Sequence, residues 1–364
     1  MIRNPRQDFS GVSVLCRRKF LGVMTVGCFA LWETRMCPAD ERPGVSAEVE
    51  RCVKDGFKFL EKQQNREGSF VAEGQAAVSV AARALLAYLA AGHIPDVGRY
   101  GLTVHRAVDF LLGQQGAQGL YGSPLLGIRA HVVATTALSQ AFGVETNSER
   151  RARIHGSLGN AVGVILGRQT SAKSQSQSGG GWAGGSPDAQ TATLPVSALS
   201  LLALKACAGI GFPLPQPVTA RAIDFSLRCF DAASGGFART PGQSADVRST
   251  CAGVVSLFAC DAAAANVPKI SSSARYILAH AAEIAAGADP VGGLGPLAAM
   301  KLGNDVWTAV EEPTVARVLK SQEKDGSWPG SKPAGRPEVS RTAATASALS
   351  VLTMSYPLLP IYQR

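Results

Sequence analysis

The stretch Phe59–Phe70 reads FLEKQQNREGSF, and it returns as FLLGQQGAQGLY over Phe110–Tyr121. Within each copy a glutamine, a glycine and an aromatic residue stand at the same places. These positions are Gln64, Gly68 and Phe70 in the first copy and Gln115, Gly119 and Tyr121 in the second. Self-similarity of this kind indicates an array of structural repeats, in which each unit buries its apolar face against its neighbours.

The repeat continues along the rest of the chain, with one more complete copy and three weaker ones. The complete copy has Gln322, Gly326 and Trp328. One weaker copy has Gly235 and Phe237 with Asp231 in place of glutamine. Another has Gln169 and Trp182 around a Ser-, Gln- and Gly-rich tract, and the last has Gly292-Gly293-Leu294 alone. Successive glycines lie roughly 50 to 60 residues apart except for a shorter last step, a period expected of helical pairs. We interpret the tract over Thr170–Gln190 as a solvated loop rather than a lid.

Each repeat unit is expected to be two helices joined by a tight turn. The first helix carries apolar residues at helical spacing, as in Val53, Phe57 and Leu60, and ends near the glutamine. The glycine permits the turn. The aromatic residue can cover the helix end, and the glutamine amide can satisfy backbone groups that the helix end leaves open.

The second helix of each unit is rich in small residues. We expect these helices over Ala76–Ala91, Val132–Ala141, Val196–Ala208, Val247–Ala265 and Thr342–Met354. A helix that is apolar or small nearly all round must be buried, and small side chains allow neighbouring helices to approach closely. The sequence therefore predicts an all-α fold, an α/α toroid in which about six helix pairs form two layers with the second helices inside.

The N-terminal residues have the features of an export signal. Arg17–Leu21 reads RRKFL, which resembles a twin-arginine signal, and the apolar stretch Leu21–Trp32 that follows is too short to span a bilayer comfortably. Cleavage after Ala39 is favoured over acylation at Cys28. We expect residues 1–39 to be the signal, residues 40–364 to be the toroid, and the protein to reach the periplasm or the cell envelope; the leader also offers a route to membrane association.

Cysteine usage and charge exclude several classes of protein. Beyond the leader the cysteines are Cys52, Cys207, Cys229, Cys251 and Cys260. This is an odd number, and most lie in apolar or small-residue runs, so a disulfide framework does not organise the fold, although one bridge remains open. The net charge is +9. Because several of these charges lie in the leader and the others are scattered, we expect no nucleic-acid partner.

The repeat resembles a known family. The pattern at Phe59–Phe70 looks like the glutamine-tryptophan repeats of squalene and hopene cyclases, and Gly235-Gly236-Phe237 with Asp246–Ser249 resembles the repeat of protein prenyltransferase β subunits. The C-terminal stretch Trp307–Arg364 is similar to exported bacterial prenyltransferase and squalene oxidase repeat proteins. The resemblance implies the toroid fold. It does not imply an activity, because one scaffold hosts cyclases, prenyltransferases and binding domains.

The sequence lacks the catalytic motifs of both enzymes that the resemblance suggests. A cyclase of that family protonates an alkene with an Asp-x-Asp-Asp run, and the aspartates here stand apart. A prenyltransferase holds zinc with an Asp-x-Cys pair and a later histidine. The nearest approximations are Asp246 with Cys251 and the adjacent Cys260-Asp261, which do not fit that spacing. We therefore assign no catalytic residue and expect neither a metal site nor a cofactor.

Three arginines recur just before or at the start of the second helices. Arg129, Arg248 and Arg341 would lie at equivalent points on the ring, and His131 opens one of the same helices. Helix N-termini attract anions, and the guanidinium fork suits phosphate or carboxylate. We predict a weak anion site at one mouth of the toroid, made by these four residues. The alternatives are that each arginine bonds the carbonyls of the preceding turn and that His131 is a structural residue.

Two functions remain open on the sequence alone. The favoured one is an exported, non-catalytic toroid that binds a protein partner or an apolar, isoprenoid-type molecule in its central cavity. The other is a divergent terpene cyclase or prenyltransferase-like enzyme. Cationic intermediates need aromatic faces, and only 6% of the residues are aromatic, which favours binding.

Overall fold

The computed structural model describes residues 46–73, 75–123, 127–170, 179–185, 191–286, 293–331, 339–354 and 358–360. All of them except Ser46 belong to one compact unit that begins at Ala47. The predicted export signal over residues 1–39, with Arg17, Arg18 and Cys28, lies outside the described residues. None of the helices that are described is long and apolar enough to cross a membrane.

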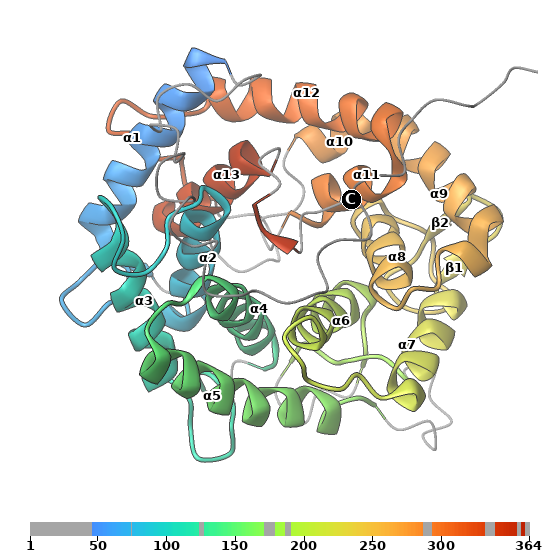
Figure 1. The fold of residues 1–364 in the computed structure, drawn as a ribbon. Helices are drawn as coiled ribbons and strands as arrows, with labels where there is room; N and C mark the ends of the chain where they lie inside the picture. Colours follow the sequence, from blue (N-terminus) through green and yellow to red (C-terminus); the bar gives the residue numbers. More distant parts are fainter. Residues whose placement is uncertain are drawn as a thin grey trace, which may run out of the picture. The chain divides into compact units, whose positions relative to one another are not determined.

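Helices alternate between an outer and an inner layer along the unit (Figure 1). The outer helices are α1 (Ala47–Gln63), α3 (Gly101–Gly113), α5 (Ser148–Gly167), α7 (Gln216–Arg228), α9 (Val267–Ala279) and α12 (Asn304–Lys320). The inner helices are α2 (Ala77–Ala90), α4 (Arg129–Val144), α6 (Leu194–Ala208), α8 (Val247–Ala259), α11 (Leu294–Leu302) and α13 (Arg341–Thr353). The short helix α10 (Ala281–Ala285) packs on α12. The predicted α/α toroid of six helix pairs is confirmed.

The inner helices are buried nearly all round, as their small residues predict. In α2, α4, α6 and α8 the buried positions do not follow one stripe but surround the helix axis. Each of these helices packs against the next inner helix and against outer helices. Alanine and serine at the contacts let the backbones approach closely, and burial on all sides stabilises the ring by removing apolar area from water.

One sequence-based expectation for the inner helices is wrong, and one inner helix was given no residue range. The helix predicted over Val247–Ala265 ends at Ala259, because Asp261 takes a left-handed conformation with φ of 56° and a short 3₁₀ turn, Ala264–Asn266, leads into α9. The fifth inner helix, α11, was not predicted, since its unit has lost both the glutamine and the aromatic residue that mark the others.

The repeated glutamines connect neighbouring units. In four units the glutamine side-chain amide donates one bond to the carbonyl of the glycine or aromatic turn of its own unit and a second to a carbonyl of the next outer helix. These pairs of acceptors are Gly68 and Thr103 for Gln64, Gly119 and Ser157 for Gln115, Gly180 and Val218 for Gln169, and Gly326 and Cys52 for Gln322. The sequence predicted that the glutamine bonds backbone groups at the end of its own unit's helix. The bond to the next outer helix was not predicted.

The pair made by Gln322 closes the ring. Its acceptor Cys52 lies in α1, so the last glutamine bonds the first helix with an Nε2–O distance of 2.8 Å, as the earlier glutamines bond the helix that follows them. The helix pair α1 and α13 is also in contact, and so are α2 and α13. The array is closed rather than an open superhelix.

The repeated glycine is required for two reasons at once. Gly68 has φ of 90°, and a Cβ atom built on it would lie 2.0 Å from the carbonyl oxygen of Arg106 in α3. Gly326 has φ of 87°, and the same added atom would lie 2.4 Å from the carbonyl oxygen of Asp55 in α1. Only glycine combines the left-handed conformation with this close approach.

The unit in which Asp231 replaces the glutamine is built differently. Its turn is a short hairpin whose strands have two residues each, with β1 (Phe230–Asp231) antiparallel to β2 (Gly236–Phe237). Asp231 accepts hydrogen bonds from the turn itself, from the Ser234 hydroxyl and the Ala233 amide. The connection to the next outer helix is made instead by Ser273 of α9, whose hydroxyl donates to the Gly235 carbonyl.

Candidate functional site

The two ends of the inner ring carry different features. Outer and inner helices alternate along the chain, so the inner helices run parallel. Their N-termini meet the repeat turns at what we call the corner end. Their C-termini meet at the opposite side, which we call the cavity end. The two ends are separated by the length of an inner helix. For α4 (Arg129–Val144) this length is roughly 24 Å, at 1.5 Å per residue.

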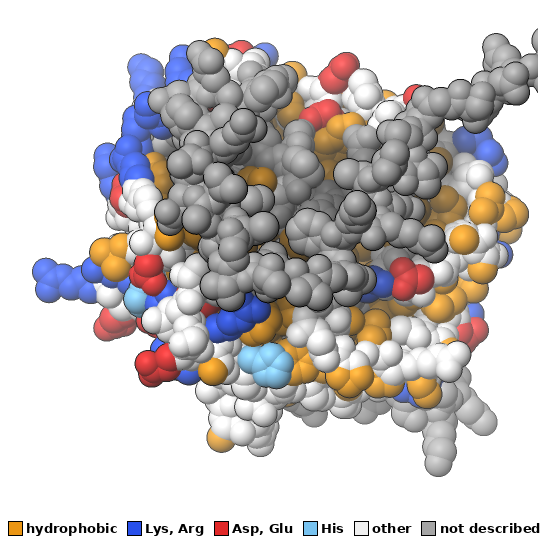
Figure 2. Space-filling model, viewed as in Figure 1, with side chains coloured by type: hydrophobic (Ala, Val, Ile, Leu, Met, Phe, Trp, Pro, Cys, Tyr) orange, Lys and Arg blue, Asp and Glu red, His pale blue; other side chains and the backbone are white. Residues whose placement is uncertain are grey.

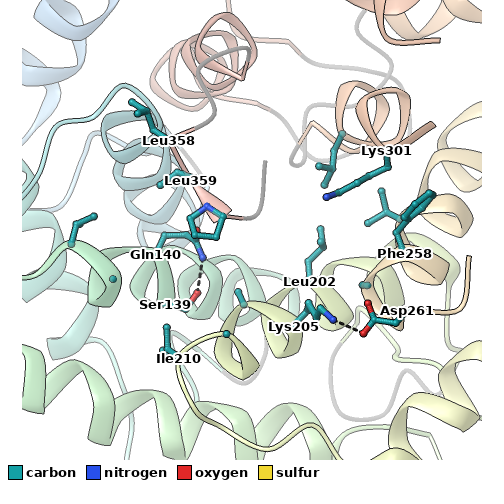
Figure 3. A pocket seen from close by; sticks show the side chains of 18 residues that line it. Ser139, Gln140, Leu202, Lys205, Ile210, Phe258, Asp261, Lys301, Leu358 and Leu359 are labelled. Atoms are coloured by element: carbon teal, nitrogen blue, oxygen red, sulfur yellow. Dashed lines mark hydrogen bonds and ion pairs between the residues drawn. The ribbon is translucent and has the colours of Figure 1, made fainter. Parts of the chain in front are cut away.

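A cavity of about 620 Å³ lies at the cavity end, in the centre of the ring (Figure 3). Its wall comes from the C-terminal halves of α4, α6 and α8, from α11, and from the described residues near the C-terminus. The apolar lining includes Leu202, Val255, Phe258, Leu297 and Leu358. This size and character are typical of sites for small organic molecules.

One amide in the wall has an unused acceptor. Gln140 is 6% exposed, and its Nε2 donates to the Ser139 hydroxyl at 3.3 Å while its Oε1 is buried without a hydrogen-bond partner. The Ser139 hydroxyl donates its single hydrogen to the Thr136 carbonyl at 2.7 Å, so it can only accept from Gln140. This assigns the positions of Nε2 and Oε1 and leaves an acceptor in need of a donor, at a cost of about 1–3 kcal/mol.

Two lysines and one carboxylate complete the polar lining (Figure 3). Lys205 of α6 is paired with Asp261, with 2.6 Å between Nζ and Oδ2, and the Asp261 side chain is 77% exposed. Lys301 of α11 extends toward the middle of the cavity. Burial, together with the positive charge of Lys205, lowers the pKa of Lys301. The cavity thus offers positive charge at one side of an otherwise apolar wall.

The outer face beside this cavity has a basic edge along α1, at the upper left of Figure 2. Acidic residues lie between these basic residues on the same helix: Lys58 pairs with Asp55 at 2.7 Å, and Arg51 lies 4.0 Å from Glu48. Both pairs are exposed, so each contributes little to stability. The alternation of charge makes this edge a solvated helix face rather than a binding surface.

Of the residues predicted to form the anion site, Arg341 is neutralised. Its Nη2 bonds the carboxylates of Glu323 and Asp325, the latter at 2.8 Å, and also the Ser327 hydroxyl at 2.6 Å. These hydrogen bonds and charges, those of Asp325 first, raise the pKa of Arg341. Arg341 holds the repeat turn of its own unit and is not available to an external anion.

His131 is a structural residue and does not face a cavity. It is fully buried, its Nδ1 accepts the Tyr121 amide at 3.0 Å, and its Nε2 donates to the Ala161 carbonyl at 3.1 Å. Burial lowers the pKa of His131 to about 4. In three other units the same acceptor role toward the amide of the turn aromatic falls to Ser197, Thr250 and Thr345. His131 is therefore the counterpart of these hydroxyls.

The charges of Arg129 and Arg248 interact, and so does the charge of Arg239, an arginine that the sequence reasoning did not select. The positive charges of Arg239 and Arg248 act on Arg129, and together with burial, the largest cause, they lower its pKa. Arg239 lies in the turn between α7 and α8, and its carbonyl accepts the Leu194 amide at the start of α6 at 2.9 Å. Arg239 lies outside the repeat motif, so the search for repeated residues did not select it.

Four of the five described cysteines are buried. None of the five described cysteines forms a disulfide within the described part of the chain. Burial raises the pKa of Cys207, Cys229 and Cys260 to about 12, so these thiols stay protonated at neutral pH. In the same part of the chain no three His, Cys, Asp or Glu side chains gather as metal ligands would.

The cavity residues were not predicted from the sequence either. Gln140, Lys301 and Phe258 occupy different helical positions in their units, so no internal repeat points to them. Lys205 and Lys301 near the C-termini of inner helices were the available signal, because charges within such apolar helices are rare.

The fold is shared with enzymes of different chemistry. The type II terpene cyclase MstE from Scytonema is similar with a TM-score of 0.55 and 16% identity over 86% of this chain and 100% of that chain. The GH76A alpha-1,6-mannanase from Salegentibacter sp. HEL1_6 is similar with a TM-score of 0.59 and 10% identity over 85% of this chain and 98% of that chain. A protein from Actinoplanes is similar with a TM-score of 0.53 and 16% identity, over 84% and 98% of the two chains.

No protein-family model matches the sequence, and no curated protein matches it. At the identities of the solved structures the likeness shows the α/α toroid and leaves the activity undetermined. The chain is an α/α toroid of the architecture that terpene cyclases and glycosidases share.

Proposed function

We propose that the toroid binds an apolar molecule of isoprenoid type in its central cavity and does not transform it. The observation that carries the proposal is the cavity of about 620 Å³ at the C-terminal ends of the inner helices, with an apolar wall that includes Leu202, Phe258 and Leu297. Burying apolar surface contributes about 25 cal/mol per Å², which is enough to hold a branched hydrocarbon chain in a cavity of this size.

The polar groups of the cavity suggest the ends of the ligand. Gln140 offers a carbonyl oxygen to a hydroxyl donor once its side chain turns toward the cavity. Lys301 offers a positive charge on the α11 side to a carboxylate or phosphate group. A ligand with a hydrocarbon body and one polar end satisfies both, because pockets of this type orient their ligands through a few polar groups.

Binding is favoured over cyclisation by the chemistry of the lining. Among the described residues of the wall Phe258 is the one aromatic side chain, and Asp261 is the one carboxylic acid. Protonating an alkene requires a buried, strong acid, whereas Asp261 is exposed and paired with Lys205. The alternative of a divergent cyclase rests on the fold shared with MstE, whose structure has been solved with geranylgeranyl dihydroxybenzoate as substrate.

Calorimetric titration of farnesol into the purified protein tests the proposal. Leu202→Arg places a charge in the apolar wall and should weaken binding by more than about tenfold, since an unpaired buried charge is costly. The matched control is Leu102→Arg, because Leu102 is 55% exposed on the outer helix α3.

Gln140→Leu should weaken binding of farnesol by roughly fivefold and leave binding of the hydrocarbon farnesene unchanged. Gln114→Leu, at an exposed position, serves as its control.

The outcomes separate the two functions. Unchanged ligand recovered from the complex by mass spectrometry supports binding, and a cyclised product recovered after incubation contradicts it in favour of the enzyme. If neither isoprenoid binds, or if Leu102→Arg and Leu202→Arg behave alike, the central cavity is not the binding site, and a protein partner becomes the better hypothesis.

We also propose that the chain acts outside the cytoplasm, in the periplasm or at the cell envelope. The support is the sequence Arg17–Leu21 followed by the apolar stretch Leu21–Trp32. Replacing both arginines by lysine, Arg17→Lys with Arg18→Lys, should retain the full-length chain in the cytoplasmic fraction if the twin-arginine signal is used. Export of the double variant at the parental level would contradict this route.

A further inference from the structure

The two lysines of the central cavity differ in their surroundings. Lys205 of α6 is engaged with the Asp261 carboxylate, with 2.6 Å between Nζ and Oδ2, and its side chain is 44% exposed. Lys301, in the last turn of α11, extends toward the middle of the cavity (Figure 3). Asp261 is the one carboxylic acid among the described residues of the wall. The two amines therefore differ in their relation to the carboxylate of the cavity.

The wall around Lys301 is apolar. Val255 and Phe258 of α8 line the cavity with it, and so does Leu297, which lies one helical turn before Lys301 on α11. Such surroundings disfavour an ammonium group, because they solvate its charge poorly. Burial, together with the positive charge of Lys205, lowers the pKa of Lys301. A larger fraction of this amine than of a surface lysine is therefore uncharged.

An uncharged lysine in an apolar cavity can react with a carbonyl group. The Nζ lone pair attacks the carbonyl carbon of an aldehyde, and the carbinolamine that forms loses water as the C=N bond is made. Both hydrogens of the amine leave with the carbonyl oxygen in that water, so the step needs no oxidant or reductant. The apolar wall favours the imine, because it limits the access of the water that would reverse the step.

We propose that Lys301 anchors an isoprenoid aldehyde in the cavity as a reversible imine. The inference rests on the proposed function, since the hydrocarbon body of the ligand must first lie against the apolar wall. It adds the chemical class of the polar end. An aldehyde gains a covalent bond to Lys301, whereas a carboxylate or a phosphate only meets the charged form of the same amine. Lys205 is not expected to react, because its amine is engaged with Asp261.

Trapping with cyanoborohydride tests the anchor on the whole chain. The protein is incubated with farnesal and reduced, and peptide mapping by mass spectrometry locates the label. We expect a farnesyl group on Lys301, with labelling of Lys205 and of the exposed Lys320 at least about tenfold lower. The mass distinguishes a reduced imine, which has lost a water, from addition to a carbon–carbon double bond of farnesal, which has not. Excess farnesol should suppress the label, because it occupies the same cavity.

Two variants provide the controls. Lys301→Met should abolish the label, and Lys320→Met, at an exposed position of α12, should keep it at the parental level. Titration with farnesol shows whether Lys301→Met still folds and binds, since an alcohol forms no imine. If this variant does not fold, the peptide map of the parent decides alone.

The outcomes separate this inference from the proposed function. Equal labelling of Lys205, Lys301 and Lys320, or addition without loss of water, overturns the imine. Binding of farnesol without a label on Lys301 overturns this inference and leaves the binding function intact. Absence of both farnesol binding and label contradicts the two proposals together.

Discussion

At the corner end of the ring the same contacts recur from unit to unit, whereas at the cavity end each loop is made in its own way. Gln64, Gln115 and Gln322 make equivalent pairs of hydrogen bonds at the corner end. At the cavity end, the loops after α2 and α4 are joined by an ion network around Arg150. Repetition thus maintains the ring, and the end that does not repeat forms the cavity.

The comparison teaches where to look for function in a closed repeat protein. A residue that recurs in every unit is needed for the contact between units, which is the same all around the ring. A residue that appears once, such as Gln140 or Lys301, is free of that requirement. The binding surface is therefore expected among the exceptions to the repeat.

The largest effect is expected from the ion network of the cavity end. The Arg150 side chain is 6% exposed and bonds two carboxylates, those of Glu145 and Asp96. The Glu145 side chain is fully buried, and the distance from Arg150 Nε to Glu145 Oε2 is 2.5 Å. Arg150→Met should lower the free energy of unfolding by about 4 kcal/mol, because it leaves the Glu145 carboxylate buried without its cation.

The control for this prediction is Arg153→Met. Arg153 pairs with Asp109 at 3.0 Å on the surface, where both side chains are more than one third exposed, so its loss should cost no more than about 1 kcal/mol. Urea denaturation of both variants measures the difference. Equal costs for the two would mean that the cavity end does not depend on the buried ion network around Arg150.

A smaller effect is expected from one glycine of the corner end. Gly68→Ala combines a left-handed backbone with a Cβ 2.0 Å from the Arg106 carbonyl oxygen, and it should cost about 3 kcal/mol. Gly98→Ala has φ of 68° but meets nothing within 4 Å, so it isolates the backbone contribution of about 1 kcal/mol. Similar losses in chemical denaturation would show that close approach between units does not select the glycine.

The ring-closing glutamine should give the next effect in size. Gln322→Leu removes two hydrogen bonds of 2.8 and 3.1 Å and should lower the free energy of unfolding by about 2 kcal/mol. Gln64→Leu provides the comparison, because it removes the equivalent two hydrogen bonds between units that follow one another in sequence. Equal losses are expected if all contacts between units are alike; a much smaller loss for Gln322→Leu would indicate that the ring opens at this contact.

The smallest effect is expected in the pH dependence of the free energy of unfolding, to which His131 contributes. Its pKa is lowered to about 4 in the folded chain, below the value in an unfolded chain, so the neutral form is stabilised by folding. This contribution is fully present above about pH 6.5 and is lost as the pH falls toward 4. Between about pH 7 and about pH 5.5 the parent should lose about 1 kcal/mol more than His131→Thr, in which a hydroxyl takes over as at Thr250. Parallel stability curves for the two chains would contradict the burial of a neutral imidazole.

The fold was predictable because its determinants are local and repeated. Gln64, Gly68 and Phe70 specify one turn, and their return along the chain specifies the array. The exceptions were missed for the same reason: α11 follows a unit without glutamine or aromatic residue, and the helix from Val247 stops at Ala259 because of the left-handed Asp261, which periodicity does not reveal.

The sites were less predictable because they depend on contacts between units. Arg129, Arg248 and Arg341 look equivalent in sequence, yet only Arg341 meets the carboxylates of Glu323 and Asp325, which are supplied by its own turn. Gln140 gains its importance from distant neighbours, namely the residues of several helices that form the wall of the cavity with it. Such pairings require the three-dimensional arrangement.

The bond from Gln322 to the carbonyl of Cys52 joins residues that are 270 positions apart. Every other glutamine of the series bonds a helix that is made soon after it, so most of the array can assemble in the order of synthesis. The final seam has to wait for the last helix pair, and until then the first helix keeps an unmatched apolar flank. Folding of this chain should therefore end in a slow, cooperative step of high contact order, and truncation near the C-terminus should damage the first helix as much as the last.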